Sequence, residues 1–401
     1  MSTASQTRLH RCAVARSSEP STHAGCLVSL SSFDTQSMLD GLRRWVEIES
    51  PTDVPEAVNR MMDAAEGAYR QAGARIERVP GRDGRGDHLV ARSPWGEGEK
   101  GILILSHLDT VHPIGFIKRL PFRVEGDAAF GPGICDMKGG VYIACEAFRR
   151  FLAEGRSPLP VTHLIVSDEE TGSQTSRELI EREGKNSRFV LVTEACREGG
   201  KVVTARKGVG QFEMLIRGIA SHAGSRPQDG RSAVRELAHQ ILELEALNDA
   251  ETGVSVTVGV VQGGTRPNVI PEEARAEIDM RLPTMALADA LIPKVLGRKA
   301  HRDGVTVTVT GELNRPPYEK TPAIAALFQQ ARALAAEIGI DLQDLSTGGG
   351  SDGNFTAPFV PTLDGLGVEG KGAHTDQEQI LISSLAPRAM LLYRLLQTLG
   401  A

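Results

Sequence analysis

Three short apolar segments, each followed at once by histidine or acidic residues, constrain the fold of this chain most strongly. Residues 101–106, 161–166 and 189–192 have the composition of strands that are buried on both faces of a sheet. Apolar residues recur at helical spacing in the neighbouring segments 36–48, 54–72 and 140–154. This alternation of buried strands and helices predicts an α/β domain with a mostly parallel central sheet.

Polar residues stand where each of these strands ends. His107 and Asp109 follow the first strand, Glu169 and Glu170 the second, and Glu194 the third. In open α/β sheets, binding sites form outside the carboxyl ends of the strands, so these side chains can converge on one crevice. His107 and Asp109 are two residues apart and leave the same face of an extended segment, so Asp109 could orient a metal-bound His107. Each pair taken alone could equally be a turn cap or a solvated acidic surface.

Two glycine-containing loops add further candidates. Asp136 lies within the segment 131–140, which has glycines on both sides of it, and His374 lies within 372–376. Glycines let a backbone approach a ligand closely, although Asp136 could also cap the helix that follows. Besides Asp109, the strand ends and these loops supply two histidines, three carboxylates and one spare glutamate. Two zinc ions need about that set, and the spare glutamate could take a proton from water.

The pattern changes near residue 208. The expected elements are strands at 210–217, 254–261, 273–281 and 305–310 and helices at 230–246 and 285–298. Their β-α-β-β-α-β order predicts an inserted ferredoxin-like α+β domain. We therefore divide the chain into a leader over 1–35, expected to be unstructured, a catalytic domain over 36–207 and 315–401, and an inserted domain over 208–314.

Four motifs resemble a known family. They are Ser106-His-Leu-Asp-Thr-Val111, Gly133-Ile-Cys-Asp-Met-Lys-Gly-Gly140, Asp168-Glu-Glu-Thr-Gly172 and Ser221-His-Ala-Gly224. In this order they resemble the dinuclear zinc metallopeptidases, which include glutamate carboxypeptidase, acetylornithine deacetylase, succinyl-diaminopimelate desuccinylase and aminoacylase. The similarity covers about residues 36–400, and the motifs are most similar to those of glutamate carboxypeptidase.

The resemblance implies a site for two zinc ions, for which Co²⁺ or Mn²⁺ could substitute. The implied ligands are His107 and Glu194 for one ion, Glu170 and His374 for the other, and Asp136 as the bridge. The peptide bond after Asp136 would be cis. Glu169 would be the catalytic base, and Asp109 would support His107.

The resemblance also implies roles in and beside the inserted domain. His222 would reach the active site of a partner subunit and hydrogen-bond the substrate carbonyl, which implies a homodimer that forms through residues 208–314; the alternative is a strand-end histidine with local hydrogen bonds. The implied substrate-binding residues are Lys207, Asn268, Arg281, Gly349, Gly350 and Ser351. Lys207 could instead be a surface charge, Asn268 a turn residue, and Arg281 the partner of Asp279 or Glu277.

Composition narrows the function further. The formal net charge is −6 and aromatic residues make up 4% of the chain, so neither electrostatics nor base stacking favours nucleic acid. No apolar run reaches the roughly 20 residues of a membrane span. The five cysteines have no regular spacing and no signal segment is evident, which predicts a cytoplasmic protein.

We therefore expect a dinuclear zinc hydrolase that cleaves the amide bond of a peptide or N-acyl amino acid beside a free carboxylate. The preferred activity is that of a glutamate-type carboxypeptidase. An N-acyl-amino-acid deacylase of the acetylornithine deacetylase type would use the same catalytic residues. A non-catalytic binding relative is disfavoured, because all five implied ligands and Glu169 are present.

Overall fold

The computed structural model describes Met1, residues 33–155 and residues 158–401. The expected unstructured leader lies outside the described residues as far as residue 32. Helix α1 begins at Thr35, where the Asp34 side chain accepts a hydrogen bond of 2.6 Å from the N–H of Ser37. An aspartate in this position satisfies a backbone donor that the first helical turn leaves free.

The first domain is built on a mostly parallel sheet, as predicted. Its strands, in spatial order, are β1 (Arg75–Val79), β2 (His88–Arg92), β6 (Val161–Val166), β3 (Gly101–His107), β7 (Ser187–Val192) and β16 (Thr362–Leu363). Strands β6, β3, β7 and β16 run parallel, whereas β2 is antiparallel to both β6 and β1. The sheet therefore presents the carboxyl ends of β6, β3 and β7 at one edge.

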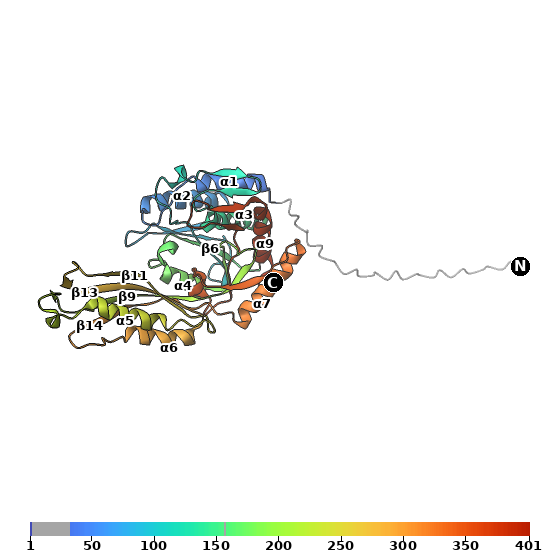
Figure 1. Ribbon diagram of the computed structural model, residues 1–401. Coiled ribbons are helices and arrows are strands. Elements are labelled where there is room, and N and C mark those ends of the chain that lie inside the picture. Colours follow the sequence, from blue (N-terminus) through green and yellow to red (C-terminus); the bar gives the residue numbers. More distant parts are fainter. Residues whose placement is uncertain (2–32, 156–157) are drawn as a thin grey trace.

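Helices cover both faces of this sheet (Figure 1). Those on one face are α1 (Thr35–Val46), α2 (Pro55–Gln71), α3 (Gly139–Glu154), α7 (Pro322–Glu337) and α9 (Leu385–Thr398), and those on the other are α4 (Arg177–Lys185) and α8 (Gly353–Thr356). Ile102 and Ile104 of β3 join the first core, and Leu103 and Leu105 join the second. Burial on both faces explains why β3 is a continuous apolar run rather than an alternating one.

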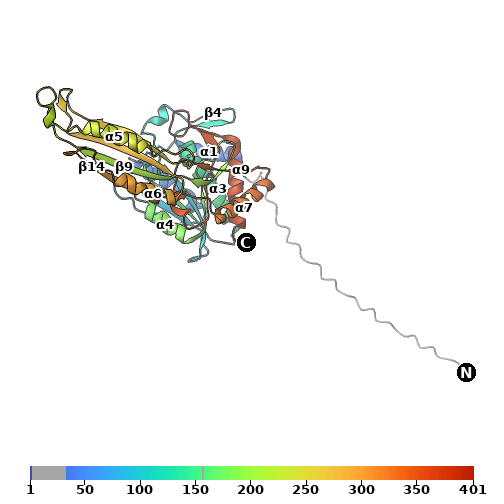
Figure 2. The same ribbon diagram turned by 60° about the horizontal axis from the view of Figure 1, so that its bottom comes forward.

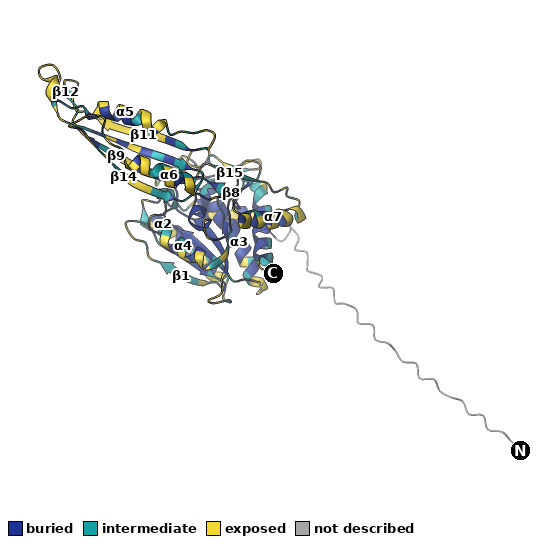
Figure 3. Cartoon of the chain, turned by 90° about the horizontal axis from the view of Figure 1, so that it is seen from below, coloured by how far each residue is buried: buried dark blue, intermediate teal, exposed yellow. Residues whose placement is uncertain are grey.

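The inserted domain has its own sheet and its own core. Its elements are β9 (Gly208–Arg217), α5 (Ala233–Glu245), β11 (Ser255–Gly263), β13 (Glu273–Leu282), α6 (Met285–Leu296) and β14 (Thr306–Arg315). The strands lie in the order β11-β13-β9-β14 and are antiparallel, with α5 and α6 along one face, which is the predicted ferredoxin-like arrangement. The domain projects from the catalytic domain (Figure 2), and its strands are more exposed than the central sheet (Figure 3).

Several element bounds differ from the sequence prediction, and two of them have a clear local reason. Helix α5 begins at Ala233 instead of residue 230, because Ser232 caps it by accepting a 3.1 Å hydrogen bond from the N–H of Arg235. Strand β14 continues past residue 310 to Arg315, because it stays paired with β9 from Arg217 back to Val209, with a register shift before Arg315. The strand therefore delivers Arg315 directly to the junction between the domains.

The remaining strands are short. They are β4 (Arg123–Glu125), β5 (Ala128–Phe130), β17 (Gly370–Lys371) and β18 (Gln379–Leu381) in one sheet, β8 (Val202–Arg206) with β15 (Asp344–Thr347), and β10 (Ser221–His222) with β12 (Val269–Ile270). At the domain junction, the Asn354 amide donates to the carbonyls of Lys207, at 3.1 Å, and Pro316, at 2.8 Å. Among the helices of residues 33–155 and 158–401, none is long and apolar enough to cross a membrane.

Candidate metal centre and active site

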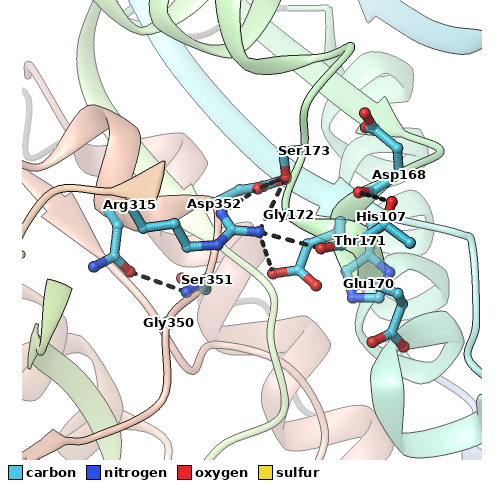
Figure 4. A network of polar contacts seen from close by, with 12 residues as sticks. His107, Asp168, Glu170, Thr171, Gly172, Ser173, Arg315, Gly350, Ser351 and Asp352 are labelled. Atoms are coloured by element: carbon cyan, nitrogen blue, oxygen red, sulfur yellow. Dashed lines mark hydrogen bonds and ion pairs between the residues drawn. The ribbon is translucent and has the colours of Figure 1, made fainter. Parts of the chain in front are cut away.

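The carboxyl ends of β3, β6 and β7 bring the strand-end residues together. His107 is the last residue of β3, Glu169 and Glu170 begin a short turn after β6, and Glu194 follows β7. His107 Nε2 lies 3.6 Å from Glu194 Oε1. Figure 4 shows His107 and Glu170 close to each other. This geometry follows from the parallel sheet, because parallel strands end at a common edge.

Asp136 lies between the two histidines. Its Oδ1 is 3.2 Å from His107 Nε2, and its Oδ2 is 3.2 Å from His374 Nε2. His374 Nε2 is also 3.1 Å from Glu170 Oε2. The peptide bond between Asp136 and Met137 is cis, as the resemblance implies. Each oxygen of the Asp136 carboxylate thus faces a different imidazole, Oδ1 that of His107 and Oδ2 that of His374.

Two groups of side chains could each hold a cation. His107, Asp136 and Glu170 form one, and His107, Glu169 and Glu194 form the other, with the ligand atoms of each group within 4.8 Å of one another. Glu170 Oε1 is buried and has no hydrogen-bond partner among the described residues. An unpaired buried carboxylate oxygen is costly unless a cation takes it up. Imidazole nitrogens and carboxylate oxygens also form a donor set that suits zinc, so these residues fit a dinuclear metal site.

The cluster attracts positive charge. Hydrogen bonds to Asp136 and Glu170 raise the pKa of His374 to about 10. Burial opposes a charge on His107, but hydrogen bonds to Asp109 and Asp136 outweigh it and raise the pKa of this histidine well above its usual value. Burial also raises the pKa of Glu194 to about 8. Carboxylates packed this closely stabilise bound cations, whether protons or metal ions.

Asp109 connects the first strand end to the second. It is fully buried, and its Oδ1 lies 3.4 Å from His107 Nδ1. Its carboxylate accepts hydrogen bonds from the N–H groups of Glu169 at 3.3 Å and Glu170 at 3.2 Å, and from Thr52 Oγ1 at 2.8 Å. Asp109 is therefore placed to orient both His107 and the Glu169–Glu170 turn.

Arg315 is part of the site, although sequence reasoning identified it only as a domain boundary. Its guanidinium lies 2.9 Å from Glu169 Oε1 and 2.7 Å from Asp352 Oδ1, and it also contacts Ser173 (Figure 4). Burial raises the pKa of Glu169 well above its usual value, and the charge of Arg315 opposes this shift. Nothing local in the sequence distinguishes Arg315 from a surface arginine, because its partners come from distant segments.

All of the expected substrate residues except Asn268 lie near the domain junction. The Lys207 ammonium donates to the carbonyl of Gly253, and Arg281 forms a two-point ion pair with Asp279 at 2.8 and 2.9 Å. The carbonyls of Gly349 and Gly350 accept hydrogen bonds from the Arg206 guanidinium. Ser351 is buried, and its hydroxyl donates to Asp364 at 2.5 Å.

His222 and Asn268 lie together in another part of the molecule. His222 belongs to β10, which pairs with β12, and β12 lies at the end of the inserted domain that is remote from the catalytic domain (Figure 3). The carbonyl of Asn268 accepts a 3.0 Å hydrogen bond from the N–H of Ala223. His222 is exposed, and its Nδ1 accepts from the N–H groups of Gly224 and Ser225, each at 3.1 Å. Within one chain these two residues do not join the metal cluster.

Comparisons with known proteins agree with this geometry. The model of "Peptidase family M20/M25/M40" matches residues 103–398. Carboxypeptidase G2 of Pseudomonas sp. (strain RS-16) is 30% identical over 384 residues, which cover 94% of this chain and 92% of that protein. Succinyl-diaminopimelate desuccinylase of Delftia acidovorans is 26% identical over 377 residues, which cover 88% of this chain and 96% of that protein.

Solved structures show the same fold. An aminopeptidase from Bacillus cereus superposes with a TM-score of 0.75 at 20% identity, over 92% of this chain and 99% of that one. A Bacillus subtilis protein described as a dinuclear metal binding peptidase of the M20 family superposes with a TM-score of 0.64 at 16% identity, over 91% of this chain and 99% of that one. At these identities the structures support the fold alone.

Proposed function

The chain belongs to peptidase family M20/M25/M40 and is a hydrolytic metallopeptidase or amidohydrolase, and we propose that it cleaves an amide bond beside a free C-terminal carboxylate. The substrate would be a peptide or an N-acyl amino acid. The main support for this proposal is that His107, Asp136 and Glu170 lie close together, beside Glu169, whose carboxylate forms an ion pair with Arg315. The relative with 30% identity over nearly the whole of both chains is a carboxypeptidase, which favours that activity.

The metal site would hold two zinc ions, with Co²⁺ or Mn²⁺ as substitutes. Its ligands would be His107 and Glu194 for one ion, Glu170 and His374 for the other, and Asp136 between them. When bound, such ions lower the pKa of a water molecule and polarise the carbonyl of the bond to be cleaved. The contacts of Asp136 with both histidines and the unpaired Oε1 of Glu170 support this assignment.

Glu169 would move the proton. It would accept a proton from the attacking water and return it to the leaving nitrogen, as a general base and then a general acid. Two contacts support this role. Asp109 holds the N–H of Glu169, and Arg315 holds its carboxylate, so the side chain has a defined direction at the edge of the cluster. Burial raises the pKa of Glu169, which makes its carboxylate a stronger proton acceptor than an exposed glutamate.

The free carboxylate of the substrate would be bound by basic residues at the domain junction. Arg281 and Lys207 offer two positive charges, and a guanidinium suits a carboxylate because it can donate two parallel hydrogen bonds. In this structure Asp279 already takes both, so substrate binding would exchange one carboxylate for another. The loop of Gly349, Gly350 and Ser351 lies beside this junction, fixed by Arg206 and Asp364.

We also propose that His222 acts across a homodimer formed through residues 208–314. The Nδ1 of His222 accepts two backbone N–H groups, so the neutral ring carries its proton on Nε2 and can donate it to a substrate carbonyl. Asn268, which lies next to β12, would enter the partner's active site together with His222 and contact the substrate there. The inserted domain also exposes apolar side chains on α5 and β11, namely Val234, Leu242, Val260 and Val261. Exposed apolar residues on an edge strand and the neighbouring helix favour association.

A deacylase is the second candidate. The succinyl-diaminopimelate desuccinylase relatives are 26–29% identical, and such an enzyme would need the same ligands and the same Glu169. A non-catalytic relative would need a broken ligand set. The three described cysteines, Cys135, Cys145 and Cys196, are free and buried, which supports a reducing compartment such as the cytoplasm.

Metal analysis paired with a substrate panel tests the proposal. The panel holds N-acyl and peptidyl derivatives of glutamate, aspartate and ornithine, and amine release is measured with and without a chelator. About two zinc ions per chain and chelator-sensitive release are expected. The preferred compound distinguishes a carboxypeptidase from a deacylase. Absence of both metal and release after zinc is added would overturn the proposal.

A further inference from the structure

Glu378 is a buried carboxylate that the proposed reaction does not use. It follows His374 by four residues, and its side chain is fully buried. Its Oε1 accepts hydrogen bonds from the N–H groups of Cys135, at 2.8 Å, and Asp136, at 3.0 Å. Its Oε2 accepts from the N–H of Gly133 at 2.8 Å and lies 2.8 Å from His112 Nε2. A single side chain thus satisfies three donors of the loop that carries Asp136.

That loop forms only a distorted π-helical turn over Ile134–Lys138, with a backbone hydrogen bond from Lys138 to Gly133 at 2.9 Å. Gly133 has φ of 69°, and Asp136 and Met137 have φ of −120° and −129°, outside the helical region. The N–H groups of Gly133, Cys135 and Asp136 donate to Glu378 instead of to carbonyls of their own segment, and buried backbone donors require such a partner. An anion that accepts several neighbouring N–H groups fixes such a loop in one conformation. Here the anion is the carboxylate of Glu378.

The backbone of Glu378 also links the segment that bears His374 to the Asp136 loop. The backbone carbonyl of Glu378 accepts a 3.3 Å hydrogen bond from the N–H of Gly131, at the start of the Asp136 loop. Glu378 itself belongs to the segment that bears His374. The carboxylate of Asp136 lies 3.2 Å from both His107 Nε2 and His374 Nε2. Glu378 therefore connects the backbone of one proposed ligand to the backbone of another.

We propose that Glu378 is a positioning residue that sets where the Asp136 carboxylate stands relative to His107 and His374. The inference rests on the proposed dinuclear site. A shift of the loop would move the Asp136 carboxylate relative to His107 and His374, so the loss of Glu378 would weaken metal binding although Glu378 is not among the proposed ligands. Partners of ligands typically contribute 10- to 100-fold in metal affinity.

The variant Glu378→Gln tests this role, because it keeps the size of the side chain but turns one acceptor into a donor that faces N–H groups. Co²⁺ is titrated into metal-free protein, and its visible absorption reports both affinity and ligand geometry. We expect about 10- to 100-fold weaker binding of at least one ion and an altered absorption spectrum. The unfolding temperature of the metal-free protein is measured in parallel.

Glu49→Gln is the matched control. Glu49 also accepts two backbone N–H groups, from Gly115 and Ile117, each at 2.9 Å, in a loop without proposed ligands. It should lower stability without changing the cobalt spectrum. If Glu378→Gln fails to fold, Glu378→Asp keeps the charge but shortens the side chain, and intermediate weakening is expected.

The wild-type titration separates the two ideas. If wild-type protein binds two Co²⁺ ions and the folded Glu378 variants bind them with the same affinity and spectrum, the positioning role is wrong and the proposed function stands. If wild-type protein binds no Co²⁺, the dinuclear site itself is wrong, and the role of Glu378 with it.

Discussion

The guanidinium of Arg315 lies 2.9 Å from the carboxylate of Glu169. Arg315 ends β14, where the chain leaves the inserted domain, and Glu169 follows β6 of the central sheet. The same guanidinium lies 2.7 Å from Asp352. The proposed catalytic base therefore contacts the residue that joins the two domains directly. A rotation of the inserted domain would displace Arg315 and so change the position of the Glu169 carboxylate.

Replacement of Glu169 by alanine should abolish turnover while both metal ions remain bound. Only the proton-transfer group is lost, because Glu169 is not among the proposed ligands. General acid–base groups contribute about 100- to 10,000-fold to the rate. Turnover of the preferred substrate and metal content are measured on the same preparation. Near-normal turnover would show that another group moves the proton.

Replacement of Arg315 by methionine should destabilise the fold. The side chain of Arg315 is buried, and its loss leaves Glu169 and Asp352 without their positive partner. Removing one partner of a buried ion pair costs about 3–5 kcal/mol. Urea unfolding measures the change. Arg43→Met, which removes an exposed pair with Glu47 on α1, is the control and should change stability little. Equal effects of the two variants would contradict a buried structural role for Arg315.

Mixing two inactive variants should restore activity if His222 acts across subunits. In a mixed dimer of Glu169→Ala and His222→Ala chains, one active site has an intact Glu169 and receives an intact His222 from its partner. Random mixing should recover about a quarter of wild-type activity. Each variant alone, re-equilibrated in the same way, is the control. If the mixture remains inactive although mixed dimers form, His222 does not act in trans.

The stability of the inserted domain should fall as the pH rises through the raised pKa of His301. Both ring nitrogens of His301 lie 2.7 Å from carboxylate oxygens, of Glu236 and Glu243, and only the protonated ring can donate to both. Hydrogen bonds to Glu236 and Glu243 raise the pKa of His301. Because the folded pKa is raised, this stabilisation is fully present below the pKa of an unfolded histidine, about 6.5, and is lost as the pH rises through the folded value.

The unfolding temperatures of wild-type protein and His301→Gln, measured from about pH 6 to pH 9, test this dependence. The difference between the two proteins should shrink as the pH rises. His239→Gln is a suitable control, since this neighbouring histidine lies beside His301 without an ion pair in the described contacts. A constant difference across the range would mean that folding leaves the pKa of His301 unchanged.

The sequence alone determined the three buried strands of the central sheet, three of the helices around it and the order of elements in the inserted domain. The apolar run 101–106 is buried on both faces as β3, and the segments of helical periodicity became α1, α2 and α3 within one or two residues. Periodicity succeeds because it records which faces of an element are buried. The position of His107 and Glu194 at strand ends also placed them together, since parallel strands share an edge.

Only the tertiary structure decided what supports these residues. Glu378 contacts the Asp136 loop across 242 positions of sequence, and Arg315 contacts Glu169 across 146. No local pattern encodes such contacts, because a buried ion pair or a carboxylate that gathers backbone N–H groups exists only after distant segments have packed. Local periodicity reports burial within one element, whereas the polar contacts that fix a site depend on which elements come to lie beside each other.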